Sequence, residues 1–232
     1  MPPPLAPLRA LRTFAHGLAG LVYPSLCLGC ERRLSRPDHA LCPACLRGLP
    51  RPEPGLAAAA LADAPVRRAA ALWTFDPGGT VRRVQHALKY GGRPSLGRPL
   101  GRLVGRVVAG EGGPAVDLVV PVPLARVRSL ERGYNQAAGL AEGAADVLGA
   151  AVAPDLLRRT RPTLRQSRLA RADRRANVAG AFALADGAGV SGLRVLLVDD
   201  VLTTGATLAA SAQTLADAGA TVDVAVLALA GA

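Results

Sequence analysis

The chain has 232 residues, half of them hydrophobic but only 3% aromatic, and its 28 basic and 17 acidic residues give a net charge of +11. This length allows one α/β domain with a small appendage, and no apolar run reaches the roughly 20 residues that a membrane-spanning helix needs. Since no small-residue cleavage site follows the mildly apolar residues 14–26, we expect no signal peptide and a cytoplasmic protein. The basic balance fits a phosphate-bearing or nucleic-acid partner, although arginine enrichment by codon usage would give the same charge.

Composition predicts four parts along the chain. Residues 1–20 begin with Met-Pro-Pro-Pro and become weakly helical, and residues 21–48 hold all four cysteines. Residues 49–66 are rich in Pro and Ala, which predicts a linker. In residues 67–232, apolar runs of strand length alternate with amphipathic stretches, a pattern that is typical of α/β domains.

The four cysteines form two pairs, Cys27-x-x-Cys30 and Cys42-x-x-Cys45, with eleven residues between the pairs. Two such pairs favour tetrahedral thiolate coordination of Zn²⁺ with no free ligand position, so the metal would be structural. Two disulfides, which are rare in cytoplasmic proteins, and a redox pair are the alternatives. The spacing therefore predicts a small N-terminal zinc ribbon, and a segment this short would need the metal in order to fold.

The alternating region predicts a parallel sheet flanked by helices. Strands are expected at residues 70–75, 116–122, 193–198 and 222–229. Helices are expected at residues 80–89, 96–109, 135–148 and 204–218, the last closed by Gly219. Because the apolar runs within the second and third strands are continuous, we expect both strands to be buried on their two faces, with right-handed crossovers between strands.

The junction between the third strand and the last helix holds the strongest candidate binding residues. The strand ends at Val198 and runs into Asp199 and Asp200, and Thr203-Thr204-Gly205-Ala206-Thr207 follows before the helix. In an open parallel sheet, ligands sit beyond the carboxyl ends of the strands, and a helix N-terminus suits a phosphate. Gly205 allows close approach, the threonines add donors, and the carboxylates can accept hydrogen bonds from sugar hydroxyls. The pattern predicts a ribose-5-phosphate site. A capped helix without a ligand is the alternative, and a Walker-type loop is excluded because the Gly-Lys-Ser/Thr ending is missing.

These residues carry a resemblance to known proteins. Residues 198–207 resemble the phosphoribosyl pyrophosphate (PRPP) signature of the type I phosphoribosyltransferases. Other segments resemble the ComF family of competence-associated proteins: Pro121-Val122-Pro123-Leu124, Arg132-Gly133-Tyr134-Asn135-Gln136, Arg161-x-Thr163-x-x-Gln166, Leu169, Arg174, Asn177 and Gly180-Ala181-Phe182. The resemblance covers roughly residues 21–232 and implies a type I phosphoribosyltransferase fold, α/β with a parallel sheet, preceded by a zinc ribbon.

The resemblance also implies roles for individual residues. Asp199 and Asp200 would be the catalytic residues that hold the ribose, and the 5-phosphate would bind to Thr203, Thr204, Gly205, Ala206 and Thr207. Lys89, Arg126 and Arg132 would contact the pyrophosphate, which Mg²⁺ would accompany. On the residues alone, Lys89 equally fits charge compensation at a helix C-terminus, and Arg126 and Arg128 fit a solvent-facing turn.

A third basic segment follows, with eight arginines between Arg158 and Arg175. Residues 157–177 lack clear periodicity, which predicts a mobile loop. Such a loop could be a lid that excludes water from the reacting sugar, or a clamp on single-stranded nucleic acid through Arg165, Arg168 and Arg171. It has no aromatic residue for stacking on bases, which weakens the second interpretation, and a solvated charged loop is the third.

Two functions follow from these residues. One is an active phosphoribosyltransferase of nucleotide or base metabolism, with an acceptor that the sequence does not identify. The other is a PRPP-binding protein of the ComF type, linked by the resemblance to DNA uptake and natural transformation. Its partners would be single-stranded DNA and a competence helicase or other DNA-processing proteins. A purely regulatory ligand-binding protein is a further alternative, because fold does not fix function.

Overall fold

The computed structural model describes residues 25–91, 93–110, 112, 115–124, 133–160 and 180–231. The chain divides into two compact units, residues 1–48 and residues 49–232. Among the helices of the described part, we find none that is long and apolar enough to cross a membrane.

The first unit is organised around its cysteines. Cys27 and Cys30 lie in a turn that is closed by an isolated bridge between Leu26 and Arg33. Cys42 caps the short helix α2 (Pro43–Arg47), because its sulfur accepts a hydrogen bond from the Cys45 N–H. In the described part of this unit the buried apolar residues are Cys27, Ala40 and Leu41. Within residues 25–48, which the structure describes, so small a core gives little stability by itself.

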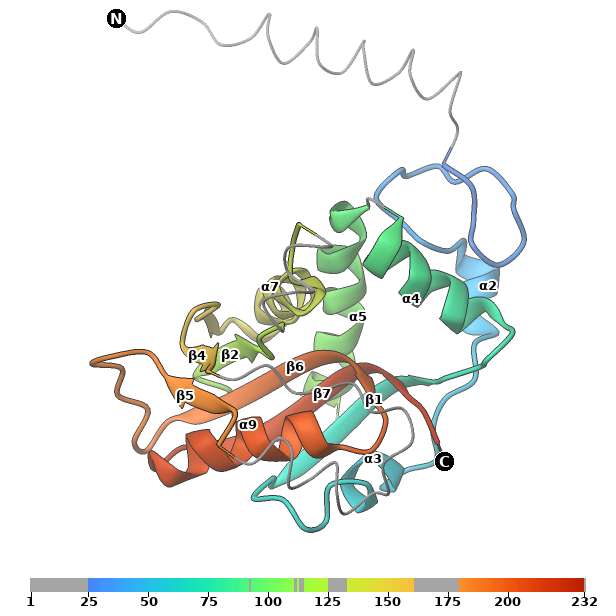
Figure 1. The fold of residues 1–232 in the computed structure, drawn as a ribbon. Helices are drawn as coiled ribbons and strands as arrows, with labels where there is room; N and C mark the ends of the chain where they lie inside the picture. The colour runs from blue at the N-terminus through green and yellow to red at the C-terminus, as the bar shows by residue number, and fades with distance from the viewer. Residues whose placement is uncertain are drawn as a thin grey trace, which may run out of the picture. The chain divides into compact units, whose positions relative to one another are not determined.

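The second unit is built on a five-stranded parallel sheet (Figure 1). Its strands in spatial order are β1 (Arg68–Thr74), β7 (Thr221–Leu229), β6 (Arg194–Leu202), β2 (Leu118–Pro121) and β3 (Ala151–Val152). The central strand β7 is buried at every position after its first residue, and the apolar run of β6 from Val195 to Val198 is also buried, as expected of strands that are covered on both faces.

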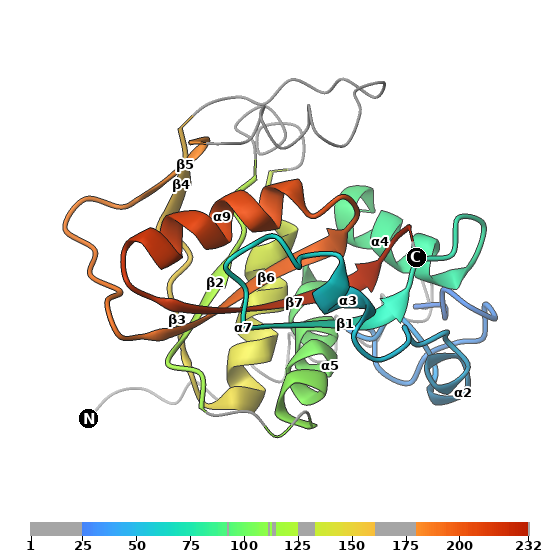
Figure 2. The same ribbon diagram turned by 90° about the horizontal axis from the view of Figure 1, so that it is seen from below.

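Helices cover both faces of this sheet (Figure 2). The short 3₁₀ helix η1 (Pro94–Leu96) leads into α5 (Gly97–Gly110), which covers one face together with α7 (Gln136–Leu148). The other face carries α9 (Ala206–Asp217) and the short α3 (Leu56–Ala59). A glycine lets α5 and α7 pack closely, since a Cβ on Gly101 would lie 2.1 Å from the carbonyl oxygen of Leu140.

Three smaller elements complete the unit. Helix α4 (Thr80–Tyr90) follows β1, and strands β4 (Leu157–Arg159) and β5 (Phe182–Leu184) form an antiparallel pair. Residues 157–177 were expected to form a loop, but the first three of them form strand β4. Leu157, which is buried, pairs with Leu184 of β5. Residues 161–177 of that loop, which include Arg165, Arg168 and Arg171, lie outside the described residues.

The predicted strands and helices of residues 67–232 are present, and two shifted boundaries matter for the binding residues. β6 continues beyond Val198 to Leu202, since its pairing with β7 also continues to Leu202, and Asp199 and Asp200 are therefore part of the strand. Helix α9 begins at Ala206 instead of residue 204.

The segment expected to be a linker, residues 49–66, is more ordered than its composition indicates. It contains α3 and contributes Ala57 and Leu61 to the core on the α9 face. The apolar side chains among its alanines and prolines give it a surface to bury, which a solvated linker does not have.

Candidate functional site

The candidate ligand site lies at the carboxyl edge of the sheet, where β6 turns into α9. Residues 203–205 form the bend, and a hollow of about 60 Å³ is lined by Asp199, Val201, Leu202, Thr203, Thr204, Gly205, Ala206, Thr207 and Leu208. The first N–H groups of α9 have no partner within the helix, which suits them to an anion. The structure thus brings the five predicted phosphate-binding residues and Asp199 together around one hollow.

Gly205 has two physical reasons to be glycine. Its φ of +75° is left-handed, a conformation that costs other residues about 1–2 kcal/mol. A Cβ would also lie 2.8 Å from Leu61 Cδ2 and 3.1 Å from the carbonyl oxygen of Ala60. The sequence predicted a close approach between this glycine and a ligand, and the structure shows a close approach to the segment after α3.

The two carboxylates have different surroundings. Asp200 forms an ion pair with Lys89 and accepts a hydrogen bond from Gln85 Nε2 at 3.0 Å. Asp199 Oδ1 accepts from the backbone N–H of Asp200 at 2.8 Å. Burial, together with the charge of Asp200, raises the pKa of Asp199 to about 8, and Lys89 opposes this only in part. The pair therefore combines a partnered carboxylate with one that resists ionisation.

A hydrogen bond from Tyr134 also holds the end of helix α4 at this edge of the sheet. Tyr134 donates its hydroxyl hydrogen to the carbonyl oxygen of Leu88, one residue before Lys89. Asn135 caps α7 by accepting from the Ala137 N–H at 3.1 Å, and its Nδ2 donates to the Val122 carbonyl oxygen at 3.0 Å. The ends of α4 and β2 and the start of α7 are therefore held together beside the carboxylates.

The structure does not place every predicted site residue. Arg126, Arg128 and Arg132 lie outside the described residues, so their contacts with pyrophosphate stay predictions. Lys89 is placed, and it reaches a carboxylate of the predicted ribose site.

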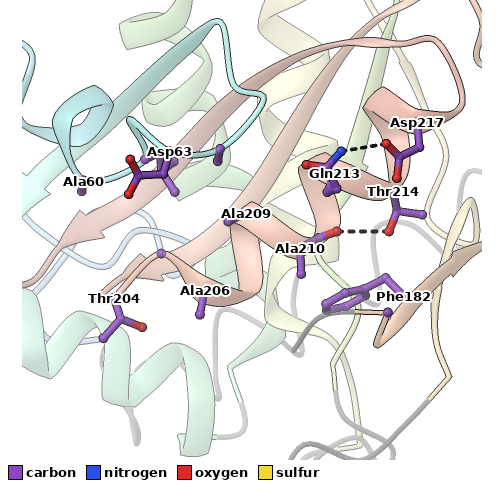
Figure 3. Close-up of a pocket in the computed structure, with 14 residues that line it drawn as sticks. Ala60, Asp63, Phe182, Thr204, Ala206, Ala209, Ala210, Gln213, Thr214 and Asp217 are labelled. Atoms are coloured by element: carbon purple, nitrogen blue, oxygen red, sulfur yellow. Dashed lines mark hydrogen bonds between the residues drawn. The ribbon is translucent and has the colours of Figure 1, made fainter. Parts of the chain in front are cut away.

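A larger pocket of about 410 Å³ adjoins the bend (Figure 3). It shares Thr204, Gly205 and Ala206 with the small hollow and continues along α9, between the turn that carries Asp63 and the ring of Phe182. Its α9 wall is fixed by two hydrogen bonds, from Gln213 Nε2 to Asp217 Oδ1 at 2.7 Å and from Thr214 Oγ1 to the Ala210 carbonyl at 3.1 Å. A volume of this size is typical of small-molecule sites.

Sequence reasoning missed Gln85 and this pocket. Gln85 had a readable signal, because it occupies a buried position in the stripe of Val81, Val84 and Leu88 on α4. A polar residue at such a position needs a partner, and here the partner is Asp200. The pocket had no signal, since segments more than 100 residues apart in the chain form it.

The four cysteines of the first unit form a candidate metal centre. The sulfurs of Cys27, Cys30, Cys42 and Cys45 all lie within 4.8 Å of one another. The distance between the Cys30 and Cys42 sulfurs is 3.7 Å. Tetrahedral zinc with Zn–S bonds of about 2.3 Å requires sulfurs about 3.8 Å apart, so the cluster fits such an ion.

The electrostatics of the cluster also favour a cation. Burial raises the pKa of Cys27, but N–H donors, including those of Cys42 at 3.2 Å and Gly29 at 3.4 Å, lower it to about 6. The side chains of Cys30 and Cys42 raise the pKa of Cys45 to about 12. Four thiolates at this spacing repel one another, and a bound cation would remove that repulsion.

Comparison with known proteins agrees with this geometry. Residues 137–232 match the model of the phosphoribosyl transferase domain. The solved structure of glutamine phosphoribosylpyrophosphate amidotransferase from B. subtilis, complexed with ADP and GMP, is 25% identical, covers 60% of this chain and 30% of its own, and superposes with a TM-score of 0.40. Residues 137–232 thus match a phosphoribosyl transferase domain, and the parallel sheet with flanking helices confirms the predicted fold class. The cysteine cluster is compatible with the predicted zinc ribbon.

Two curated relatives show which proteins with such a domain this chain resembles. The chain is 37% identical over 139 residues to the DNA utilization protein YhgH of Salmonella typhi, a match that covers 58% of this chain and 60% of the relative. It is 40% identical over 93 residues to Competence protein F of Haemophilus influenzae, covering 40% of this chain and 41% of the relative. The chain is thus a homologue of YhgH and Competence protein F, which confirms the resemblance to the ComF family. The matches span less than two thirds of these relatives.

Proposed function

We propose that this protein binds PRPP at the carboxyl edge of β6 and acts, as a ComF-type protein, in DNA utilization. One observation carries the proposal: a single hollow joins Asp199 to the five residues Thr203, Thr204, Gly205, Ala206 and Thr207 at a helix N-terminus. A 5-phosphate is recognised by the loop, and the diol of a ribose is recognised by adjacent carboxylates. The part in DNA utilization is supported by the names of the relatives.

Within this proposal, each side chain has a defined part. The α9 N–H groups and the threonine hydroxyls neutralise the 5-phosphate, and Asp199 and Asp200 accept hydrogen bonds from the ribose hydroxyls. Lys89, which forms an ion pair with Asp200 in the absence of ligand, would exchange that carboxylate for a pyrophosphate oxygen. Mg²⁺ would accompany the ligand, bound mainly by pyrophosphate oxygens, since this ion keeps several oxygen ligands that are not protein groups.

Calorimetric titration of the full chain with PRPP and Mg²⁺ tests this proposal. Thr207→Val removes a proposed hydrogen bond to a charged phosphate, so we expect affinity to fall about 10- to 150-fold, from about 1.5–3 kcal/mol for such a bond. The matched control is Thr214→Val on the same helix, whose hydroxyl is bonded to the Ala210 carbonyl. Equal affinities for the two variants, or no binding by the unmodified chain, would contradict the proposal.

We also propose that the cysteine cluster holds structural zinc. Sulfur spacing and the N–H donors support a tetrahedral thiolate site, and four protein ligands leave no open position for catalysis. Metal analysis of the purified chain should give one equivalent of zinc, and less than half an equivalent would argue against the proposal.

An active phosphoribosyltransferase is the second candidate function, favoured by one observation. A carboxyl group whose pKa is near 8, as for Asp199, can exchange a proton at neutral pH, which is a property of acid–base catalysts. Pyrophosphate release in the presence of PRPP and a panel of nucleobases would support catalysis. PRPP binding without pyrophosphate release across that panel would leave a ligand-binding role.

A further inference from the structure

Helix α4 presents a basic and aromatic stripe to solvent. Arg82, His86 and Tyr90 follow one another at intervals of four residues, and all three are exposed. Tyr90 is 60% exposed and, with Leu26, is one of the two exposed large hydrophobic residues in the described part of the chain. The opposite side of the helix is buried. The stripe is therefore an outer surface of the second unit.

The two rings of the stripe lie together. The ring centroids of His86 and Tyr90 are 5.1 Å apart with an interplanar angle of 45°. Arg82 precedes them on the same face, and its exposed neighbour Arg83 donates to Thr80 Oγ1 at 3.0 Å. No acidic residue occurs in α4, and the Asp76 carboxylate just before the helix accepts a hydrogen bond from the backbone N–H of Arg82 at 3.0 Å. A single exposed ring is ordinary on protein surfaces, but paired rings beside two arginines on a helix without acids form a platform with a cationic end.

The stripe ends next to a residue that contacts the proposed PRPP site. Lys89, next to Tyr90 in the chain, forms an ion pair with Asp200, and the Leu88 carbonyl accepts the hydrogen bond from Tyr134. Because these contacts fix the end of α4, the stripe has a defined position beside the carboxylates. The Arg-rich segment, residues 158–177, contains no aromatic residue on which a base could stack, whereas α4 contains His86 and Tyr90.

We propose that the α4 stripe (Arg82, Arg83, His86 and Tyr90) binds single-stranded DNA. Unpaired bases stack on the His86–Tyr90 rings, and the arginines contact the phosphates. Stacking requires bases that are free of a partner strand, so the stripe fits single-stranded better than double-stranded DNA. This inference rests on the proposed function, for which it supplies the DNA-contacting surface of the second unit.

Fluorescence anisotropy with a labelled 20-nucleotide oligo-dT, repeated over a range of salt concentrations, tests the inference. Tyr90→Ala should weaken binding about 5- to 150-fold, the equivalent of losing one stacked base, whereas Tyr90→Phe should keep it. Arg82→Gln should reduce the salt slope by about 0.7, the value for one phosphate of a single strand. The control is Arg106→Gln, which removes an exposed arginine from α5 and should change neither quantity. PRPP binding is measured on every variant.

The outcomes separate the inference from the function on which it rests. Retained PRPP and oligo-dT binding by Tyr90→Ala and Arg82→Gln would overturn the stripe and leave the proposed function intact. No oligo-dT binding by the unmodified chain would remove the DNA role and the stripe together, while PRPP binding still stands on its own test. If Tyr90→Ala misfolds and loses both ligands, the salt slope of oligo-dT binding by Arg82→Gln tests the proposal instead. An unchanged slope would contradict a role of the stripe in DNA binding. Equal weakening of duplex binding by Tyr90→Ala would also contradict base stacking.

Discussion

Replacing Asp199 by asparagine should change how stability depends on pH. In the folded protein the pKa of Asp199 is about 8, whereas an unfolded aspartate has a pKa of about 3.9. Between these values the folded state binds more protons than the unfolded state. The free energy of unfolding therefore falls as pH rises through this range, and the contribution of the protonated carboxyl is lost above about pH 8. An asparagine at this position has a similar shape and does not titrate, so this dependence disappears.

The magnitude follows from the size of the shift. Each pKa unit corresponds to about 1.36 kcal/mol, so the span from about 3.9 to about 8 gives an upper limit of about 5–6 kcal/mol. Asp199 is only partly buried and lies at the edge of a hollow, so water reduces this value. We expect the variant to gain about 1–3 kcal/mol relative to the unmodified chain between pH 5 and pH 8.

Urea unfolding at a series of pH values measures this difference. Trp73, the single tryptophan of the chain, is fully buried in β1, and its fluorescence reports on the second unit. Thr207→Val is the control, because it alters the lining of the same hollow without removing a titratable group. Parallel stability curves for Asp199→Asn and the unmodified chain from pH 5 to pH 8 would refute the burial argument. A gain that grows towards low pH would refute its sign.

Three further predictions concern other parts of the site and the metal cluster. Lys89→Met should cost about 1–3 kcal/mol of stability, measured by urea unfolding, because it leaves the half-buried Asp200 without its cation. Gly205→Ala should lower the free energy of unfolding by about 1–3 kcal/mol, because the new Cβ strains the left-handed φ and contacts Leu61. In a double-mutant cycle, Leu61→Ala should restore the part of this loss that comes from the contact and leave the part that comes from φ. Cys42→Ser should reduce bound metal to less than half an equivalent and make the first unit sensitive to proteolysis, as a chelator would in the unmodified chain.

Much of the fold could be read from the sequence because its strongest signals are local. The run from Val195 to Val198 is apolar at every position, which indicates a strand covered on both sides, and all four residues are fully buried. The cysteine pairs were equally readable, since their spacing alone brings four sulfurs together. The passage from a strand into a helix near residue 203 was also predicted, although α9 begins at Ala206, two residues later than expected.

Boundaries that depend on distant partners could not be read in this way. The acidic pair at residues 199–200 interrupts the apolar run of β6, which indicates a strand end, but the register with β7 continues to Leu202. The segment after α3 looked like a linker because its packing partner, α9, follows about 150 residues later. The contact of Lys89 with Asp200 likewise depends on the tertiary position of α4, which periodicity does not give.

Under the proposed function, the surroundings of the acidic pair would make PRPP a better complement to this site than a simple phosphate. Asp200 has a cation and an amide donor, whereas ionisation of Asp199 is opposed by burial and by Asp200 itself. A ligand that is anionic at both ends can draw Lys89 towards its pyrophosphate, and its sugar hydroxyls can replace that cation as donors to the carboxylates. Inorganic phosphate offers no such donors, and it would occupy the α9 N-terminus while leaving the acidic pair unchanged. We therefore expect the site to prefer a molecule that carries both a phosphate and a diol, because α9 offers N–H donors to the first and β6 offers carboxylates to the second.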